Sequence, residues 1–424
     1  MPPWVFGDEI HHLDYVLKLS RGHLPDSREA IEPRVFELHR DRWDWRYGSK
    51  TPLPKVKNPS EFGIGAYSFQ AKHPPLAHII MSLFRLIFLP FRPSLLFQVK
   101  LLRCSSLLAV CGGLWLVYAG LKKIGNLDPV FYYPLLFIGL LPQDMFITIN
   151  NDAYSFLFGG LFIWAAIRIF LRPESADRWG WLALGTCCLA WIKATNFMFF
   201  ALWLVLTFFI WRAAKGARVI GRSIVFFLVS LILSLPWYIF NYVRYSYAFG
   251  YHYSGVAGVP SYPSNGFSPA SLEFFFSAFT RTLFRGELVW NGLYFEPLTG
   301  RWNAILITIL PLAVGLLGLA FLFKKAVETK ERLAEFFAFC GLAIMAILIF
   351  GHAYIGKIPF YHARFVFGGL YFLFFLYAAG WKTLFRSKAP AFWIPAAWLF
   401  FFNVWYTILL VSRVVAQPVF THLS

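Results

Sequence analysis

A small set of ionisable residues lies at the ends of long apolar runs, where they could do chemistry at a membrane boundary. The set has three acids and five cations: Asp8, Glu9, Asp152, Lys100, Arg103, Lys193, Arg244 and Arg364. A charge at membrane depth is costly, so such residues are functional candidates by default. Cations there can bind an anionic headgroup, and a carboxylate can take a proton from a hydroxyl. Each residue alone could equally be an interfacial anchor, but their convergence on one face favours a site.

The elements that must position these residues are membrane helices. Of the 424 residues, 58% are hydrophobic, 20% are aromatic and 14% are charged, whereas a soluble domain carries about 25% charged residues. Apolar runs with the length of a membrane span, or nearly so, occupy residues 98–121, 129–146, 152–171, 179–193, 196–211, 219–241, 302–323, 333–350, 364–384 and 390–412. We therefore predict an all-α polytopic membrane protein with about ten transmembrane helices.

The remaining segments predict loops and one interfacial helix. The apolar stretch 76–91 is interrupted by Arg85 and followed by Arg92, which is typical of a helix that lies in the membrane surface. The preceding residues, 1–73, are too charged to span. We divide the chain into a first loop with interfacial helices, a first group of transmembrane helices, a second polar loop and a last group of helices: 1–97, 98–241, 242–301 and 302–424.

Alternate connectors are strongly basic, which predicts the orientation. They contain Lys122, Lys123, Arg168, Arg172, Arg178, Arg212, Lys215, Arg218, Arg222, Lys324, Lys325, Lys330, Arg332, Lys382, Arg386 and Lys388. If these connectors are cytoplasmic, the excess of positive charge falls on the inner side at every turn. Both large loops and the C-terminus are then extracytoplasmic. Because the segment from Met1 to Trp4 has no features of a signal peptide, we expect a first transmembrane helix to be missing before it.

Two other classes of site are disfavoured by the composition. The formal net charge is +18, but the basic residues lie between apolar runs and form no stripe of the kind that binds nucleic acid. The five cysteines all fall inside apolar stretches, so we interpret them as small buried hydrophobic residues rather than disulfides or zinc ligands: Cys104, Cys111, Cys187, Cys188 and Cys340.

Several short motifs occur in the order found in one family of membrane enzymes. They are Gly7-Asp8-Glu9-Ile10-His11-His12 followed by Leu19-Ser20-Arg21-Gly22-His23-Leu24-Pro25, then Lys72-His73-Pro74-Pro75-Leu76, Leu101-Leu102-Arg103-Cys104-Ser105, Leu141-Pro142-Gln143, Asn150-Asn151-Asp152-Ala153, Ala190-Trp191-Ile192-Lys193, Pro236-Trp237-Tyr238-Ile239-Phe240-Asn241 and His362-Ala363-Arg364-Phe365. Together they resemble GT-C glycosyltransferases, especially glycosyltransferase family 39, the protein O-mannosyltransferases and the aminoarabinose transferases. The chain departs from that pattern at the missing first helix, at His362, where Gly is usual, and at Phe365, where Tyr is usual.

The resemblance implies a reaction at the membrane boundary. Enzymes of this type transfer a sugar, with inversion, from a polyprenyl phosphate in the bilayer to an acceptor outside, which can be a protein, a lipid or a glycan. Asp8 matches the first acid of the family and is our candidate for the general base. Glu9 would hold the acceptor or a cation, and Asp152 would position the acceptor or the loop.

The resemblance also assigns the basic residues. The anionic lipid head would be bound by Arg103, Lys193, Arg244 and Arg364, because a guanidinium fork matches two phosphate oxygens. We expect Arg103 and Lys193 to be unpaired near the hydrocarbon before phosphate binds. Lys72 and His73 are further candidates for the phosphate, although a residue before two prolines can instead serve to form a turn.

Three alternatives remain open. A flippase or transporter for lipid-linked sugars would also have many spans, although we find no inverted repeat of the kind such proteins show. A catalytically inactive relative could serve as an assembly partner. A metal-dependent enzyme is a third possibility, because Asp8, Glu9 and Asp152 could share Mg²⁺ or Mn²⁺ through oxygen ligands.

Overall fold

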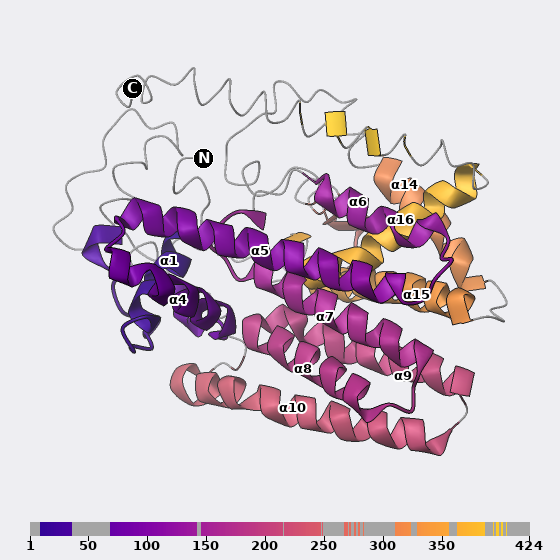
Figure 1. Ribbon diagram of the computed structural model, residues 1–424, viewed down its shortest axis with the longest axis horizontal. Helices are drawn as coiled ribbons and strands as arrows, with labels where there is room; N and C mark the ends of the chain where they lie inside the picture. Colours follow the sequence, from indigo (N-terminus) through magenta and orange to yellow (C-terminus); the bar gives the residue numbers. More distant parts are fainter. Residues whose placement is uncertain are drawn as a thin grey trace.

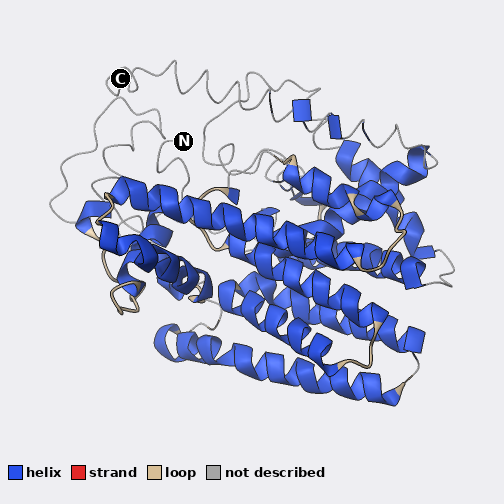
Figure 2. Ribbon diagram, in the orientation of Figure 1, coloured by secondary structure: helices blue, strands red, loops and turns tan. Residues whose placement is uncertain are grey.

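The computed structural model describes residues 9–35, 68–141, 146–214, 216–246, 248, 310–323, 329–355 and 363–385, and isolated positions within 267–283 and 393–404. These residues form helices and loops, with no β-strand among them (Figure 2). The α-helices are α1 (Glu9–Leu19), α4 (Leu76–Phe88), α5 (Leu95–Lys122), α6 (Tyr133–Gly139), α7 (Asp152–Leu171), α8 (Ala176–Ile192), α9 (Met198–Ala214), α10 (Ala217–Tyr245), α14 (Leu310–Leu317), α15 (Thr329–Ile355) and α16 (Leu370–Phe385). Short 3₁₀ helices include η6 (Ala194–Phe197) and η10 (Ala363–Gly369).

In the part of the chain that the structure describes, six helical segments are long and apolar enough to cross a membrane. They are Leu95–Lys122, Asp152–Leu171, Ala194–Arg212, Ala217–Tyr245, Thr329–Tyr354 and Arg364–Phe385. Lengths and compositions of this kind are those of a multi-span membrane protein. Figure 1 shows the long helices side by side in one bundle, with α1 and α4 at one end.

Ten spans were predicted, and four of those predictions are not confirmed. Residues 129–146 contain a 3₁₀ turn over Pro129–Phe131 and the seven-residue α6. A proline lies in the first two positions of each, where proline favours the start of a new helix. The predicted span 179–193 corresponds to α8, which has 17 residues and lies between α7 and α10. The structure describes 302–323 only from residue 310, and 390–412 only at isolated positions.

The short helix predicted over 76–91 is present as α4 with a following turn. Its buried side contains His78, Ser82 and Arg85, and Ser82 donates a hydrogen bond to the carbonyl of Val16 in α1. Its other side exposes four apolar residues: Ile79, Leu83, Leu86 and Ile87. This two-sided pattern is the one expected of a helix at a membrane surface.

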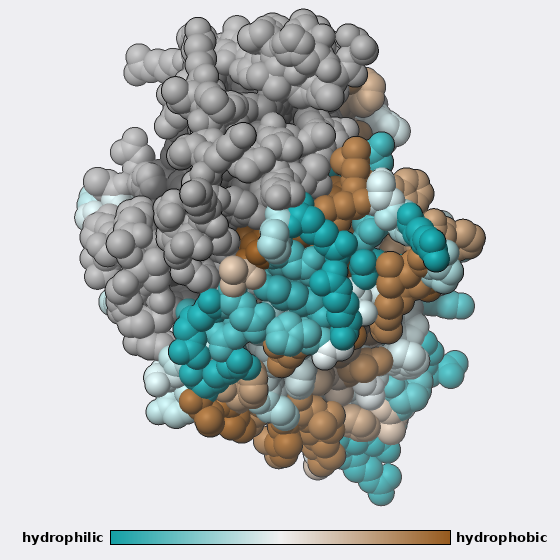
Figure 3. All heavy atoms as spheres, turned by 90° about the vertical axis from the view of Figure 1, so that its left-hand side faces the viewer, coloured by the Kyte–Doolittle hydropathy of each residue, from teal (hydrophilic) through white to brown (hydrophobic). Residues whose placement is uncertain are grey.

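The two ends of the bundle differ in chemistry. At one end, which we call the basic end, the basic connectors contact one another and neighbouring acids. Its ion pairs and hydrogen bonds join Arg178 to the Arg168 carbonyl, Arg222 to Glu174, Arg212 to Glu335, Lys330 to the Asn126 carbonyl and Lys382 to Asp128. The opposite end, here the site end, has α1 and α4. Figure 3 looks onto it and shows a broad hydrophilic area bordered by hydrophobic residues.

Small residues let the central helices α5 and α7 approach closely. A Cβ atom at Gly160 of α7 would lie 2.5 Å from the carbonyl oxygen of Gly113 in α5. A Cβ at Gly113 would in turn lie 2.6 Å from the carbonyl oxygen of Phe156. Membrane helices associate largely through such close packing, so this contact fixes α5, which bears Arg103, against α7, which begins at Asp152.

We predict that Gly160→Ala destabilises the protein by about 1–3 kcal/mol, because the added methyl group overpacks the α5–α7 contact. Gly221→Ala is the matched control, since no atom lies within 4 Å of a Cβ at Gly221 in α10. Alanine there should be neutral or slightly stabilising. Thermal unfolding in detergent measures both, and equal melting temperatures for the two variants would contradict the close contact.

Candidate functional site

Glu9 and Arg103 form a buried ion pair at the site end. The Arg103 guanidinium donates from Nε to Oε1 at 2.8 Å and from Nη2 to Oε2 at 2.6 Å. The backbone N–H of Ile149 donates to the same Oε1 at 3.1 Å. The Glu9 residue is only 1% exposed. The two-point contact joins α1 to α5 and ties both to the segment before α7.

Asp152 and Lys193 form a second buried pair. Their side-chain atoms are 2.5 Å apart, and the residues are 2% and 3% exposed. The Lys193 ammonium lies 4.6 Å from the centre of the Phe365 ring, and the Arg364 guanidinium lies 5.6 Å from the same ring. The start of α7, the end of α8 and η10 therefore bring three of the predicted site residues together.

Irregular backbone with asparagine side chains makes this geometry possible. Lys193 is extended, with φ −157° and ψ 137°, so α8 ends at the residue before it. Asn150 Oδ1 accepts from the N–H groups of Asp152 at 2.7 Å and Ala153 at 3.0 Å. It thereby satisfies two of the backbone donors that the first turn of α7 leaves without a helical partner. Asn151 donates to the carbonyl of Ile192, and Asn196 donates to that of Leu189. The asparagines thus hold the two ends where the ion pair forms.

A buried histidine pair lies beside these charges. His12 Nδ1 and His78 Nε2 are 2.8 Å apart, and the Tyr15 ring stacks on His78 with ring centres 4.2 Å apart. Burial lowers the pKa of His78 to about 3, with a further contribution from His73. Burial also lowers the pKa of His12 well below its usual value, and the charges of His78, His73 and Arg364 add to that effect. Both rings are therefore neutral at pH 7.

The other predicted cations lie in an outer contact. Arg244, at the end of α10, pairs with Asp26 in the first loop, with Nη2 2.7 Å from Oδ2. Although burial alone would raise it, hydrogen bonds from Arg28 and Arg244 lower the pKa of Asp26 to about 2. The Lys72 ammonium lies 5.5 Å from the centre of the Tyr245 ring. These contacts clamp the first loop onto α10.

The structure contradicts the expectation for Arg103 and Lys193 and does not test the one for Asp8. The prediction that Arg103 and Lys193 are unpaired is wrong, because each has a carboxylate partner. Asp8, the candidate base, lies outside the described residues, although it directly precedes Glu9. Among the described residues, no group of three or more His, Cys, Asp or Glu side chains is arranged to hold a metal ion. The metal-dependent alternative needs Asp8 and stays a prediction.

Sequence reasoning missed the His12–His78 contact, Asn196 and Asp26. The tandem His11-His12 and an asparagine at the start of an apolar run were signals, because each places a polar side chain where hydrocarbon is expected. No pattern indicated Asp26.

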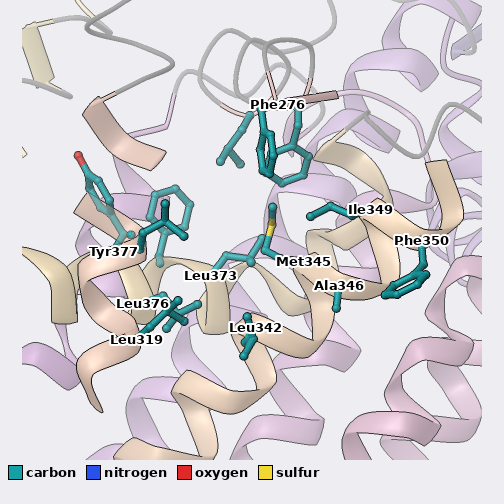
Figure 4. Close-up of a pocket in the computed structure, with 15 residues that line it drawn as sticks. Phe276, Leu319, Leu342, Met345, Ala346, Ile349, Phe350, Leu373, Leu376 and Tyr377 are labelled. Atoms are coloured by element: carbon teal, nitrogen blue, oxygen red, sulfur yellow. The ribbon is translucent and has the colours of Figure 1, made fainter. Parts of the chain in front are cut away.

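An apolar cavity of about 350 Å³ lies elsewhere, between η9 (Gly318–Phe323), α15 and α16. Leu319, Leu342, Met345 and Leu373 are among its lining residues (Figure 4). None of the predicted site residues lines it, and its walls have almost no polar surface. It is therefore unsuited to phosphate.

No protein-family model and no curated protein matches this chain. The assignment of a function therefore rests on the residues and their geometry.

We predict that Asp152→Asn alone destabilises the fold by about 3–5 kcal/mol, because it leaves the Lys193 ammonium buried without its carboxylate. Adding Lys193→Met should recover most of that loss. Unfolding in detergent of both single variants and the double variant forms a mutant cycle. Additive losses would show that the two side chains do not interact.

We predict that acidification destabilises the protein through the histidine pair. In the folded protein the pKa values of His12 and His78 lie below 6.5, the ordinary value that they have in the unfolded chain. As the pH falls from about 6.5 toward 3, the unfolded chain therefore binds more protons than the folded protein does. Each histidine then contributes a loss of up to about 1.4 kcal/mol per pH unit.

The double variant His12→Gln, His78→Gln should flatten this pH dependence. His23→Gln is the control, since that side chain is exposed and pairs with Glu29. Thermal stability measured between pH 7 and pH 4.5 is the readout. If the double variant loses as much stability on acidification as the unaltered protein, the neutral pair is not the cause.

Proposed function

We propose that this protein is a membrane glycosyltransferase that moves a sugar from a polyprenyl-phosphate donor to an acceptor on the extracytoplasmic side, with inversion. The observation that supports this most is the gathering of Arg103, Lys193 and Arg364, with Glu9 and Asp152, at one end of an apolar bundle. A lipid with an anionic head, held in the bilayer, would bring its phosphate to that depth. A cation cluster there is suited to it.

The orientation follows from the two ends of the bundle. The described basic connectors lie at the end opposite the Glu9–Arg103 and Asp152–Lys193 pairs, and such connectors are typically cytoplasmic. The site end would then be extracytoplasmic, together with the first and second polar loops. An acceptor could reach it from water while the donor stays in lipid.

The residues have distinct parts in this proposal. Arg103, Lys193 and Arg364 would hold the phosphodiester, whose single negative charge is shared by two oxygens. The acceptor hydroxyl oxygen forms the new bond to the anomeric carbon as the bond from that carbon to the phosphate oxygen breaks. The electron pair leaves with polyprenyl phosphate, and the hydroxyl proton passes to Asp8. No strong general acid is needed, since the leaving phosphate is a stable anion.

The ion pairs set the conditions for binding. Both Glu9 oxygens accept from Arg103, and Ile149 adds a third donor. Glu9 is thereby better placed to fix the Arg103 fork than to move a proton. The phosphate would share Arg103 and Lys193 with their carboxylates, which limits the net charge of the empty site.

We predict that Asp8→Asn lowers transfer from radiolabelled polyprenyl-phosphate sugars by about 10²–10⁴-fold while donor binding is kept, because the amide has the size of the acid but no basicity. Asp177→Asn is the control, an exposed acid at the basic end. The assay uses membranes that contain the full chain. Near-normal turnover of Asp8→Asn would remove Asp8 as the base, and sugar movement without a new glycosidic bond would indicate a transporter.

Sidedness is tested separately in a variant without the five native cysteines. Cysteines at Ser60 and Ser264, in the two polar loops, should react with an impermeant reagent in sealed cells. A cysteine at Glu174, at the basic end, should react only after the membrane is opened. The reverse pattern would place the ion pairs on the cytoplasmic side and overturn the proposed reaction site.

A further inference from the structure

The last turns of α10 have the features of a movable segment. Pro236 lies inside this helix, and proline cannot donate the hydrogen bond to the residue four positions before it, so helices bend at such points. Beyond it, Ile239, Tyr242 and Val243 are 57%, 63% and 79% exposed. This outward side is apolar, as a surface against lipid would be. The segment 237–245 therefore presents an apolar outer surface at the site end.

The inward side of this segment contains polar atoms that the protein leaves without a partner. Trp237 Nε1 and Asn241 Oδ1 are buried and accept or donate no hydrogen bond in the described part of the chain. The two residues are one helical turn apart, so they share a face. Thr195 Oγ1, in η6, is buried and unpartnered as well. Its neighbour Ala194 packs with Trp237, which brings η6 against this face of α10.

We call this contact between 237–245 and η6 the α10 seam. It offers one N–H donor, one carbonyl acceptor and one hydroxyl, with no net charge, and its surroundings include the rings of Trp191, Phe197 and Tyr238. Buried polar groups normally have a partner, and leaving one unpaired is costly. Neutral donors and acceptors beside aromatic rings suit a ligand with several hydroxyl groups. Thr195 is two residues from Lys193, so such a ligand would lie next to the ion pairs.

Hydrogen bonds between neutral groups and one partly exposed ion pair hold the seam shut. Asn241 Nδ2 donates to the Lys72 carbonyl at 2.8 Å, and the Tyr245 hydroxyl accepts from the Ser27 N–H at 3.3 Å. Tyr238 Oη donates to the Ala190 carbonyl of α8 at 2.6 Å. The Arg244–Asp26 pair, whose arginine side chain is 33% exposed, lies at the end of the segment. Exposed pairs of this kind stabilise weakly. The outermost part of the closure is thus weaker than the two buried ion pairs behind it, and an outward movement of 237–245 must also break the Tyr238 hydrogen bond.

We propose that the α10 seam is a binding site for the hydroxyl-bearing ring of a carbohydrate, entered from the bilayer when 237–245 swings outward about Pro236. Resting on the proposed function, the ring is that of the lipid-linked donor. The unpartnered groups Trp237 Nε1, Asn241 Oδ1 and Thr195 Oγ1 then gain the hydrogen bonds that they lack in the closed state.

Cysteine accessibility tests the opening without any assay of transfer. In a full chain without native cysteines, Asn241→Cys is compared with Ser230→Cys, a buried position on the same helix before Pro236. With a hydrophilic thiol reagent, residue 241 should react at least about tenfold faster than residue 230, and Pro236→Ala should slow that reaction. Equal rates at the two positions, or no effect of Pro236→Ala, would overturn the hinged opening.

Protection from the same reagent identifies the ligand. Farnesyl phosphate bearing mannose or arabinose should slow labelling of Asn241→Cys, and bare farnesyl phosphate should not. If only free acceptor sugars protect, the seam binds the acceptor and not the donor. If none of these probes protects, the seam is not a carbohydrate-binding site. Protection without measurable transfer would keep the site and remove the proposed transferase activity.

Thr195→Val gives an independent readout, because it removes only the unpartnered hydroxyl. It should leave the melting temperature unchanged or higher, yet raise KM for the donor about three- to tenfold with little change in kcat. Thr186→Val is the matched control, whose hydroxyl donates to the Leu182 carbonyl within α8. A lower melting temperature with unchanged KM for Thr195→Val would mean that this hydroxyl is structural.

Discussion

The cost of placing a charge at membrane depth governs the site end of this protein. A lone buried charge is expensive, so the acids and cations there are found in pairs. Glu9 holds Arg103, and Asp152 holds Lys193. These contacts connect residues far apart in the sequence, and they fix the relative positions of α1, α5, α7 and α8. The fold and the candidate site therefore depend on the same interactions.

Pairing also explains how the site can be both stable and receptive. An unpaired cation cluster would bind phosphate strongly but would repel itself in the empty protein. Carboxylates remove that repulsion, and the neutral His12–His78 pair adds no further charge. In the proposed reaction, an incoming phosphate would share cations that are already held in place, which reduces the cost of ordering them on binding. The asparagines contribute in the same way, because Asn150 fixes the start of α7 and Asn196 fixes the end of α8.

The sequence was sufficient for the features that depend on local composition. The apolar runs predicted the six long helices, Arg85 and Arg92 marked the short α4, and the basic connectors do gather at one end. The 129–146 span is not confirmed as a single helix, because its described part contains a 3₁₀ turn at Pro129 followed by the short α6. The ion pairs could not be predicted, since Glu9 and Arg103 are 94 positions apart and no periodic pattern links them. The His12–His78 and Asp26–Arg244 contacts could not be predicted for the same reason, since their residues are 66 and 218 positions apart.

The arrangement of strong and weak contacts gives the site end a direction in which it can open. The Glu9–Arg103 and Asp152–Lys193 pairs are buried, so separating their charges is costly. The outer contact between Arg244 and Asp26 is partly exposed and screened by water. Pro236 removes one backbone hydrogen bond from α10 shortly before the outer contact. An outward movement of the last turns of α10 would therefore break the outer contact and leave the two buried ion pairs intact. Because that contact belongs to α10, whose far side exposes Ile239 and Val243, such an opening would face the bilayer, as the proposed lipid-linked donor requires.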